Sequence, residues 1–518
     1  MDRTLNTSTR DPRRHARVAS AMAALLATAV ASSALAQPSP KRDGDIAFGA
    51  CDAPGVFRTF ASKTGETLST TYGPTGWAGN VFIDVSPTDS NCTGASPSLS
   101  CLAGVVNVKA PTPADAGVPS SSKVTLSSTR AFTAADVGSE ARWSTQTTLA
   151  TDTNQTCTQS YRFHVTNDGG GWGDPHLTTV DGVQYDFQGA GEFTALRQKT
   201  LEIQTRQTPV PTATVPITNP YTGITHCVAI YTAVAARLGS TRITLQPGLA
   251  NGEASPEGMQ LRVNGTLATL TDRGIVLHDK GGKAVEGVIR KAATGAFEIT
   301  DADGTQLVVT PAYWDSQKVW YLNVNVYQTW ATLGTMGKIS QGGWLPALPD
   351  GSSLGPKPES EDERYDQLYK KFADAWRVTD ATSLFDYAQG QNTATFTRTE
   401  WPRNHPKTCD IEGQVSVVAT TATVAAEACH GVTDPVRRAN CEFDVAITGN
   451  TGFGKSYEAM QAFHPTGSGW VDVNLGGGGG GGDTPPPASS WWIKWWWVIL
   501  LALLLVVIVV RLARRPGP

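Results

Sequence analysis

Residues 172–182 read WGDPHLTTVDG and residues 185–193 read YDFQGAGEF, and this stretch decides how the rest of the chain is interpreted. It brings acidic residues, a histidine, an Asp-Pro bond and several glycines into one short segment. Such a set is compatible with an active site, a metal site or a cleavage site. It is equally compatible with the tight turns at the start of a β-rich domain. The sequence on either side distinguishes between these interpretations.

The flanking sequence has the pattern of β-strands. Before the stretch, runs such as 80–85 (NVFIDV) and 157–165 (CTQSYRFHV) are separated by Gly, Pro, Asp and Ser turns, which predicts a β-sandwich. After it, runs such as 201–207 (LEIQTRQ) and 318–330 (KVWYLNVNVYQTW) continue the β pattern towards residue 400. We expect NDGGG at 167–171 to be a flexible joint between two β-rich domains.

One segment breaks the β pattern with the spacing of an amphipathic helix. Residues 360–378 (SEDERYDQLYKKFADAWRV) begin with Ser360 and Glu363 in a capping-box arrangement. The apolar positions recur at helical spacing and are Tyr365, Leu368, Tyr369, Phe372 and Trp376. This pattern predicts a helix that packs its aromatic face against the strands of the second domain.

Both ends of the chain have the features of membrane-targeting segments. Residues 1–36 place a basic segment with Arg10, Arg13, Arg14 and Arg17 before an alanine-rich apolar run that ends at Ala34–Ala36. This predicts a cleaved secretory signal, with an uncleaved N-terminal anchor as the alternative. Residues 491–512 begin with five tryptophans in an apolar run long enough to span a bilayer, which predicts a single transmembrane helix. The alternative at this end is a removable sorting tail like those of bacterial surface proteins.

The arginines after the apolar run set the expected orientation, since basic flanks of a membrane helix stay in the cytoplasm. We therefore expect a single-pass type I membrane protein whose body lies in the periplasm or at the cell surface. Residues 476–490 are rich in Gly and Pro and predict a linker to the membrane. The net charge is −4, and the terminal segments are basic, so the body between them is more acidic still. An acidic body argues against nucleic acid as a partner.

All eight cysteines lie in the part of the chain expected outside the cytoplasm, where disulfides form. Close spacing favours the pairs Cys92–Cys101 and Cys429–Cys441, while Cys51–Cys157 would join the ends of the first domain and Cys227–Cys409 would remain. Residues 403–475 hold three of these cysteines and a mixed helical pattern. A helical pattern at 418–432 is expected to be closed by Asp434–Pro435. We interpret residues 403–475 as a small appendage on the preceding domain.

The opening stretch resembles the start of the von Willebrand factor type D domain. The matching motifs are Gly173-Asp174-Pro175-His176, Thr179-Val180-Asp181-Gly182, Tyr185-Asp186-Phe187, Gly189 and Glu192-Phe193. Further along, 333–337 (LGTMG) stands where the family has C-G-L-C-G, and 372–378 (FADAWRV) resembles its closing segment. The resemblance covers about residues 172–400. It implies a β-rich extracellular module that works in adhesion, matrix contact or assembly rather than in catalysis.

Departures from the family pattern bear on partners and metals. Both cysteines of C-G-L-C-G are absent from 333–337, and Gly191 replaces another, so disulfide-linked multimers are not expected. The resemblance implies that Asp181 is a calcium ligand, but the loop 338–343 (KISQGG), which should complete the shell, has no carboxylate. Asp181 is therefore either a calcium ligand without its usual partners or the residue that fixes the turn before Gly182. No other cofactor is expected.

Asp174–Pro175 is a candidate cleavage site, because some members of the family are cut between these two residues. The Asp174 carboxylate would attack its own peptide carbonyl, and the proline nitrogen would be the leaving group. We expect no catalytic role for His176, since no serine or cysteine nucleophile is recognisable beside it. Residues 301–304 (DADG) resemble half a calcium loop but lack the downstream ligands, which indicates a hairpin turn.

These patterns predict a mainly β membrane protein. Its expected parts are a signal peptide at 1–36, an immunoglobulin-like β-sandwich at 37–170, a type D-like domain with one clear helix at 171–402, the appendage at 403–475, the linker at 476–490, the single transmembrane helix at 491–512 and a cytoplasmic tail at 513–518. The expected function is non-enzymatic adhesion or binding of an unidentified protein, matrix or cell-surface ligand. The alternatives are a structural envelope component that mediates assembly and a protein self-cleaved at Asp174–Pro175.

Overall fold

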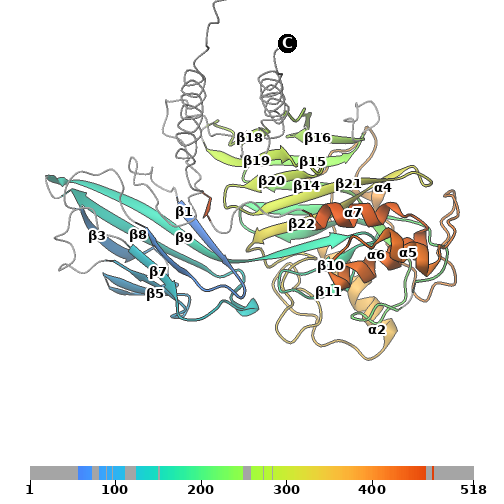
Figure 1. Cartoon of the computed structure of the whole chain (residues 1–518), viewed down its shortest axis with the longest axis horizontal. Helices are drawn as coiled ribbons and strands as arrows, with labels where there is room; N and C mark the ends of the chain where they lie inside the picture. Colours follow the sequence, from blue (N-terminus) through green and yellow to red (C-terminus); the bar gives the residue numbers. More distant parts are fainter. Residues whose placement is uncertain are drawn as a thin grey trace, which may run out of the picture. The chain divides into compact units, whose positions relative to one another are not determined.

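Long β-strands dominate the computed structural model of this chain, which is mainly β and contains several sheets (Figure 1). The structure describes residues 57–72, 81–88, 90–95, 97–110, 124–149, 152–216, 218–248, 258–271, 274–282, 284–462 and 470–471. The predicted signal peptide, linker, transmembrane helix and tail lie outside these residues, as does Cys51. Within the described ranges, no helix is both long enough and apolar enough to cross a membrane.

The first two sheets face each other (Figure 1). One contains, in order, β2 (Ser69–Tyr72), β7 (Val124–Ser128), β6 (Val106–Lys109), β5 (Ser98–Cys101) and β4 (Cys92–Ala95). The other contains β3 (Val81–Pro87), β8 (Glu140–Leu149), β9 (Asp152–Trp172), β1 (Phe57–Lys63) and β23 (Trp470–Val471). Alternate residues such as Val106 and Val108 are buried, which is the two-residue period of strands with one face on a core.

Strand β9 belongs to two groups of strands. Its first part pairs with β8 and β1, and its last part pairs with β10 (His176–Thr178) and β22 (Val319–Thr329). The prediction of a flexible joint at 167–171 is therefore wrong, because these residues lie inside β9. Glycine serves packing here, since a Cβ on Gly171 would approach the ring of Tyr231 to within 2.6 Å. The boundary expected after residue 170 falls within this one strand.

Two groups of strands follow β9 in sequence. One continues from β9 in the order β11 (Gln184–Asp186), β10, β9, β22, β21 (Gln306–Trp314), β20 (Phe297–Asp301), β19 (Val285–Lys291) and β18 (Ile275–His278). The other contains β12 (Gly191–Arg197), β13 (Leu201–Pro209), β14 (Ala229–Leu238), β15 (Thr241–Pro247), β16 (Met259–Val263) and β17 (Thr266–Leu267). Nearly every residue of β14 is buried, because Leu384 and Phe385 pack against Ala233 and Ala235 on its second face.

The helix expected at 360–378 is present. It consists of α2 (Glu361–Tyr365), a π-helical stretch η2 (Asp366–Phe372) and α3 (Ala373–Trp376), which follow one another directly. Ser360 Oγ accepts a hydrogen bond from Glu363 N (3.5 Å), so it caps the helix as predicted. All the apolar residues of the predicted face are buried, namely Tyr365, Leu368, Tyr369, Phe372 and Trp376. The helix therefore packs this face into the large core, and α3 contacts β12 (Gly191–Arg197).

The region that follows is more helical than its sequence pattern predicts. After the short α4 (Thr393–Phe396) come α5 (Ala422–Ala428), α6 (Pro435–Thr448) and α7 (Gly452–Gln461), which pack around one buried cluster. The prediction that Asp434–Pro435 closes a helix is wrong, because these residues begin α6. Asp434 Oδ1 accepts a hydrogen bond from Arg437 N (2.9 Å). Pro435 lies in the first turn of α6, where a backbone N–H has no partner within the helix, so the missing N–H of proline costs no hydrogen bond.

Three disulfides are present among the described residues, with the same pairings that the sequence favours. They are Cys92–Cys101, Cys227–Cys409 and Cys429–Cys441. The first joins β4 to β5, and the last joins α5's C-cap to α6. Of these three disulfides, Cys227–Cys409 links the two cysteines that are furthest apart in sequence. Cys227 lies just before β14, so this disulfide holds the segment around Cys409, which leads into α5–α7, next to the start of that strand.

Removal of Cys227–Cys409 should destabilise the protein more than removal of Cys92–Cys101. The first pair is separated by 182 residues and the second by 9. In the loop-entropy model this difference corresponds to about 3 kcal/mol of unfolding free energy. Denaturant unfolding of Cys227→Ala/Cys409→Ala and of Cys92→Ala/Cys101→Ala measures the two losses. Equal losses would contradict the expected order.

Residues 301–304 form the hairpin turn between β20 and β21, as the sequence indicates. Asp301 Oδ1 accepts hydrogen bonds from the backbone N–H groups of Asp303 and Thr305, both at 2.9 Å. The Asp303 carboxylate pairs with Arg162. Burial, together with the nearby charge of Asp303, raises the pKa of Asp301 to about 8.

Asp301→Asn should flatten the pH dependence of stability. In the folded chain Asp301 keeps its proton up to about pH 8, whereas in the unfolded chain it loses its proton at about pH 4. The native state binds more protons between these values, so the contribution of the protonated carboxyl is full below about pH 4 and is lost as the pH rises towards 8. Urea unfolding at several pH values measures the slope. The exposed Asp84→Asn is the control, and an unchanged slope in Asp301→Asn would contradict this expectation.

Candidate functional site

The opening motif forms the end of β9, a tight turn and the hairpin β10–β11. Trp172 ends β9, and Gly173 has a φ of 61°, a conformation that glycine adopts without strain. The backbone N–H of His176 donates a hydrogen bond to the Asp174 carbonyl inside the turn. Across the hairpin, His176 is the direct partner of Asp186. The turn and the strand register therefore place the acidic and histidine side chains of the motif next to each other.

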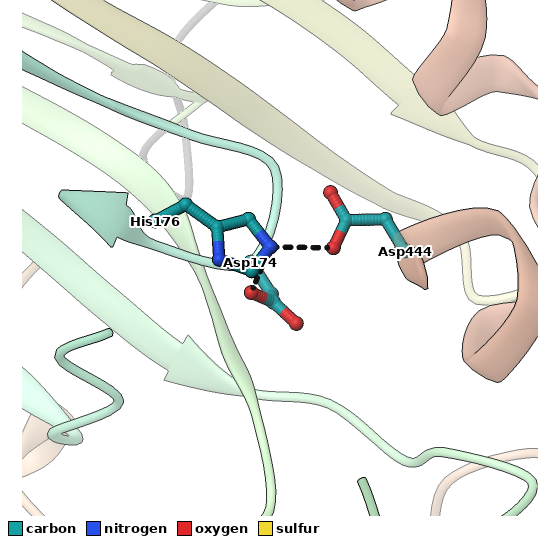
Figure 2. A group of neighbouring side chains, drawn as sticks. All are labelled: Asp174, His176 and Asp444. Atoms are coloured by element: carbon teal, nitrogen blue, oxygen red, sulfur yellow. Dashed lines mark hydrogen bonds and ion pairs between the residues drawn. The ribbon is translucent and has the colours of Figure 1, made fainter. Parts of the chain in front are cut away.

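His176 is surrounded by three carboxylates that come from three segments of the chain. Figure 2 shows its ring beside Asp174, from the preceding turn, and Asp444, from α6. Nε2 lies 2.9 Å from Asp174 Oδ1 and 3.2 Å from Asp444 Oδ1. On the other side of the ring, Nδ1 lies 2.7 Å from Asp186 Oδ1. The side chains of Asp174 and Asp444 are 1% and 0% exposed, and that of His176 is 10% exposed.

Further polar side chains hold the carboxylates in place. Gln188 Nε2 donates to Asp174 Oδ1 (3.2 Å), while Gln188 Oε1 accepts a hydrogen bond from Ala229 N (2.7 Å). Tyr457 of α7 donates its hydroxyl to Asp444 Oδ2 (2.9 Å). Asp174 Oδ2 is buried without a hydrogen-bond partner. Every carboxylate oxygen on the Nε2 side of the ring is thus satisfied within the protein except Asp174 Oδ2.

The approach of α6 to the motif depends on Gly173. A Cβ at this position would overlap the Asp444 carboxylate and lie 2.7 Å from the Tyr457 hydroxyl. Any other residue would therefore push α6 and α7 away from the hairpin. Gly173, the glycine of the G-D-P-H motif, therefore has a packing role as well as a conformational one.

Burial and neighbouring charges shift the pKa values of the groups in this cluster. Burial alone would lower the pKa of His176, but Asp174, Asp186 and Asp444 together raise it well above its usual range. Burial, and then the charge of Asp174, raise the pKa of Asp444 well above its usual range. Burial would also raise the pKa of Asp186, but the charge and hydrogen bond of His176 lower it. Burial and the neighbouring charges therefore shift His176 and Asp444 towards their protonated forms and Asp186 towards its ionised form.

A pocket of about 410 Å³ opens beside the cluster, between the β10–β11 hairpin and α6. His176 and Asp186 line it. Aromatic rings contribute much of the remaining wall, with Trp172, Tyr185, Tyr221, Phe443 and Tyr457 among its residues. Arg437 of α6 lies over the Trp172 ring, with its guanidinium carbon 4.0 Å from the ring centroid. The pocket is large enough for one side chain or one sugar ring.

Asp181, the candidate calcium ligand, lies in the turn of the hairpin and away from the His176 cluster. Its Oδ1 accepts a hydrogen bond from Thr179 Oγ1 (2.6 Å), and its Oδ2 accepts one from Ile339 N (3.1 Å). The loop 338–343 therefore does approach Asp181, but it offers a backbone N–H where a cation would need an oxygen. These contacts favour the turn-fixing role, and calcium binding stays a prediction.

Cleavage at Asp174–Pro175 also stays a prediction. The carbonyl of this peptide bond accepts a hydrogen bond from the His176 N–H, which would polarise it towards attack. The Asp174 carboxylate, however, is engaged by His176 and Gln188.

Asp444 and Tyr457 are site residues that the sequence patterns do not predict, because they lie on α6 and α7. One signal was available. In the α6 segment, Cys441, Asp444, Val445 and Thr448 share one helical face, and a carboxylate within an otherwise apolar face needs a buried polar partner. Without α6 and α7 assigned, nothing linked that carboxylate to the G-D-P-H motif.

No protein-family model matches this chain, and no curated protein matches it. The similarity of residues 172–400 to type D domains therefore rests on the motifs themselves.

Calcium should leave the thermal stability of the wild-type chain unchanged, because both carboxylate oxygens of Asp181 accept hydrogen bonds within the protein. Asp181→Ala should lower the unfolding free energy by about 1–3 kcal/mol, since it removes two hydrogen bonds, one of them to a backbone N–H. The measurement is thermal unfolding with excess calcium and with a chelator. A calcium-dependent rise in melting temperature that Asp181→Ala abolishes would establish the metal site instead.

Proposed function

We propose that this chain is a cell-envelope protein that binds a surface or matrix ligand outside the cytoplasm, through the pocket between the β10–β11 hairpin and α6. In this proposal residues 37–170 form an immunoglobulin-like sandwich, residues 171–402 form a type D-like domain, and the helix at 491–512 anchors the protein. The motifs of 172–193 and the character of both chain ends support it. The disulfides suit an oxidising compartment, which agrees with export.

The observation that carries the proposal is Arg437. Its guanidinium stacks on Trp172 at the pocket wall, and no carboxylate among the described residues pairs with it. A stacked guanidinium presents its N–H donors edge-on, in a geometry that matches a carboxylate, sulfate or phosphate group. We therefore infer that the ligand carries an anionic group at the part that enters the pocket.

The rest of the pocket suits the neighbouring part of such a ligand. Tyr221 and Phe443 offer ring faces or edges to an apolar surface, and Asn440 offers an amide donor and acceptor. A terminal unit of an anionic surface polymer, with one charged group and one compact ring or chain, fits this combination of size and chemistry.

Blocking the pocket should abolish binding. Ala439 is exposed in α6 and lines the pocket, so Ala439→Trp would fill it without disturbing the core. Arg437→Ala should weaken binding about tenfold or more, because it removes the cation that the anionic group would contact. The measurement is retention of the untagged full-length chain, in mild detergent, on arrays of anionic and neutral surface polymers and matrix proteins.

The matched control is Val418→Trp, which adds the same ring at a position 82% exposed and outside the pocket. It should bind as the wild type does. Binding that survives Ala439→Trp, or that is confined to neutral components, would overturn the proposal. Self-association without any retained component would favour a structural role in envelope assembly.

A further inference from the structure

We propose that Asp174, His176 and Asp444 form a binding site for a divalent transition-metal ion such as Zn²⁺. The ligand atoms would be Asp174 Oδ1, His176 Nε2 and Asp444 Oδ1, which all lie within 4.8 Å of one another. This inference goes beyond the proposed ligand-binding function and does not depend on it.

The distances suit a shared ion. With metal–ligand bonds of about 2.0–2.2 Å, neighbouring ligand atoms of a tetrahedral or octahedral shell lie about 2.9–3.5 Å apart. The imidazole Nε2 lies 2.9 Å from one carboxylate oxygen and 3.2 Å from the other. Both carboxylate oxygens therefore lie at the distances from Nε2 that two ligands of one ion would have, and all three ligand atoms lie within 4.8 Å of one another.

The far side of the ring is arranged as metal sites require. His176 Nδ1 lies 2.7 Å from Asp186 Oδ1, so with an ion on Nε2 this nitrogen would keep its proton and donate it to Asp186. Asp186 comes from the neighbouring strand, and the register of β10 and β11 fixes it opposite His176. A carboxylate–histidine–metal arrangement of this kind orients the ring and makes it a better ligand. The Tyr457 hydroxyl plays the equivalent part for Asp444, since it holds the oxygen that would not bind the ion.

The charges of the cluster call for a cation. Three carboxylates face one imidazole in a buried site, and none of their described ion partners is a lysine or an arginine. Asp174 is 1% exposed, yet its Oδ2 has no hydrogen-bond partner. A buried carboxylate oxygen without a donor is costly, and a divalent ion at Oδ1 would lower that cost by neutralising the group. This unpartnered oxygen is independent of the distances and points to the same conclusion.

The ligand set selects the class of ion. Calcium prefers six to eight oxygen ligands, whereas one imidazole with two carboxylates is a set typical of zinc and its neighbours in the first transition row. Three protein ligands would leave at least one position for water or another small ligand. His176 and Asp186 line the pocket, whereas the side chains of Asp174 and Asp444 are buried.

The test is Zn²⁺ binding to the untagged full-length chain in mild detergent, after removal of metals with a chelator. Competition against a chromophoric chelator measures affinity and stoichiometry, and Co²⁺ substitution reports the coordination through its visible absorption. We expect one ion per chain, a higher melting temperature with Zn²⁺, and a Co²⁺ spectrum of an ordered nitrogen–oxygen shell. His176→Gln and Asp444→Asn should each weaken Zn²⁺ binding at least tenfold. Asp186→Asn should weaken it about 10–100-fold and keep one ion per chain.

His405→Gln is the matched control. His405 also has two neighbouring carboxylates, at 3.0 Å from Asp362 and 3.7 Å from Glu361, but its side chain is 55% exposed. This variant should bind Zn²⁺ as the wild type does. Circular dichroism of each metal-free variant verifies that it is folded. The proposal is overturned if the folded wild type binds no Zn²⁺, or if folded His176→Gln and Asp444→Asn bind it as tightly as the wild type.

Discussion

The burial of His176 among three carboxylates constrains how two parts of the chain meet. Asp174 and Asp186 arrive from one short hairpin, whereas Asp444 arrives from a helix more than two hundred residues later. Each group would be unstable in a buried position without the others, and removal of one partner of a buried charged pair typically costs about 3–5 kcal/mol. The helices α6 and α7 are therefore part of the site and are more than an appendage beside it. The contact between α6 and the hairpin requires Gly173, because a larger residue would leave no room for the Asp444 carboxylate.

The hairpin that carries these groups owes its position to β9. This strand pairs with β8 and β1 along its first part, and then with β22 and β10 along its last part. The glycines at 169–171 allow the second pairing, because side chains there would collide with the opposite sheet and with neighbouring strands. A hairpin fixed at the end of a doubly paired strand is a rigid support, which a site with hydrogen-bond distances of about 3 Å requires.

Much of the fold was predictable from local patterns. Period-two strands and the aromatic face of residues 360–376 follow from spacing alone, and the short-range disulfides follow from proximity along the chain. NDGGG was misinterpreted because a glycine run has the same composition whether it bends freely or packs tightly against a ring such as Tyr231. Asp434–Pro435 was misinterpreted because the same dipeptide ends one helix and begins another, and only the residues after it decide which.

The candidate site was only half predictable. Asp174, His176 and Asp186 fall within one short stretch, so their proximity follows from a hairpin, but the partner on α6 is a matter of tertiary packing that no local pattern contains. This partner changes the meaning of the motif. Cleavage at Asp174–Pro175 needs the Asp174 carboxylate free to reach its own carbonyl carbon. The cluster instead directs Oδ1 towards His176 Nε2 and Gln188 Nε2. An attack through Oδ1 would break these contacts, so whatever strengthens the cluster, a proton on His176 or an ion in its place, opposes cleavage by that oxygen and leaves only Oδ2 for it.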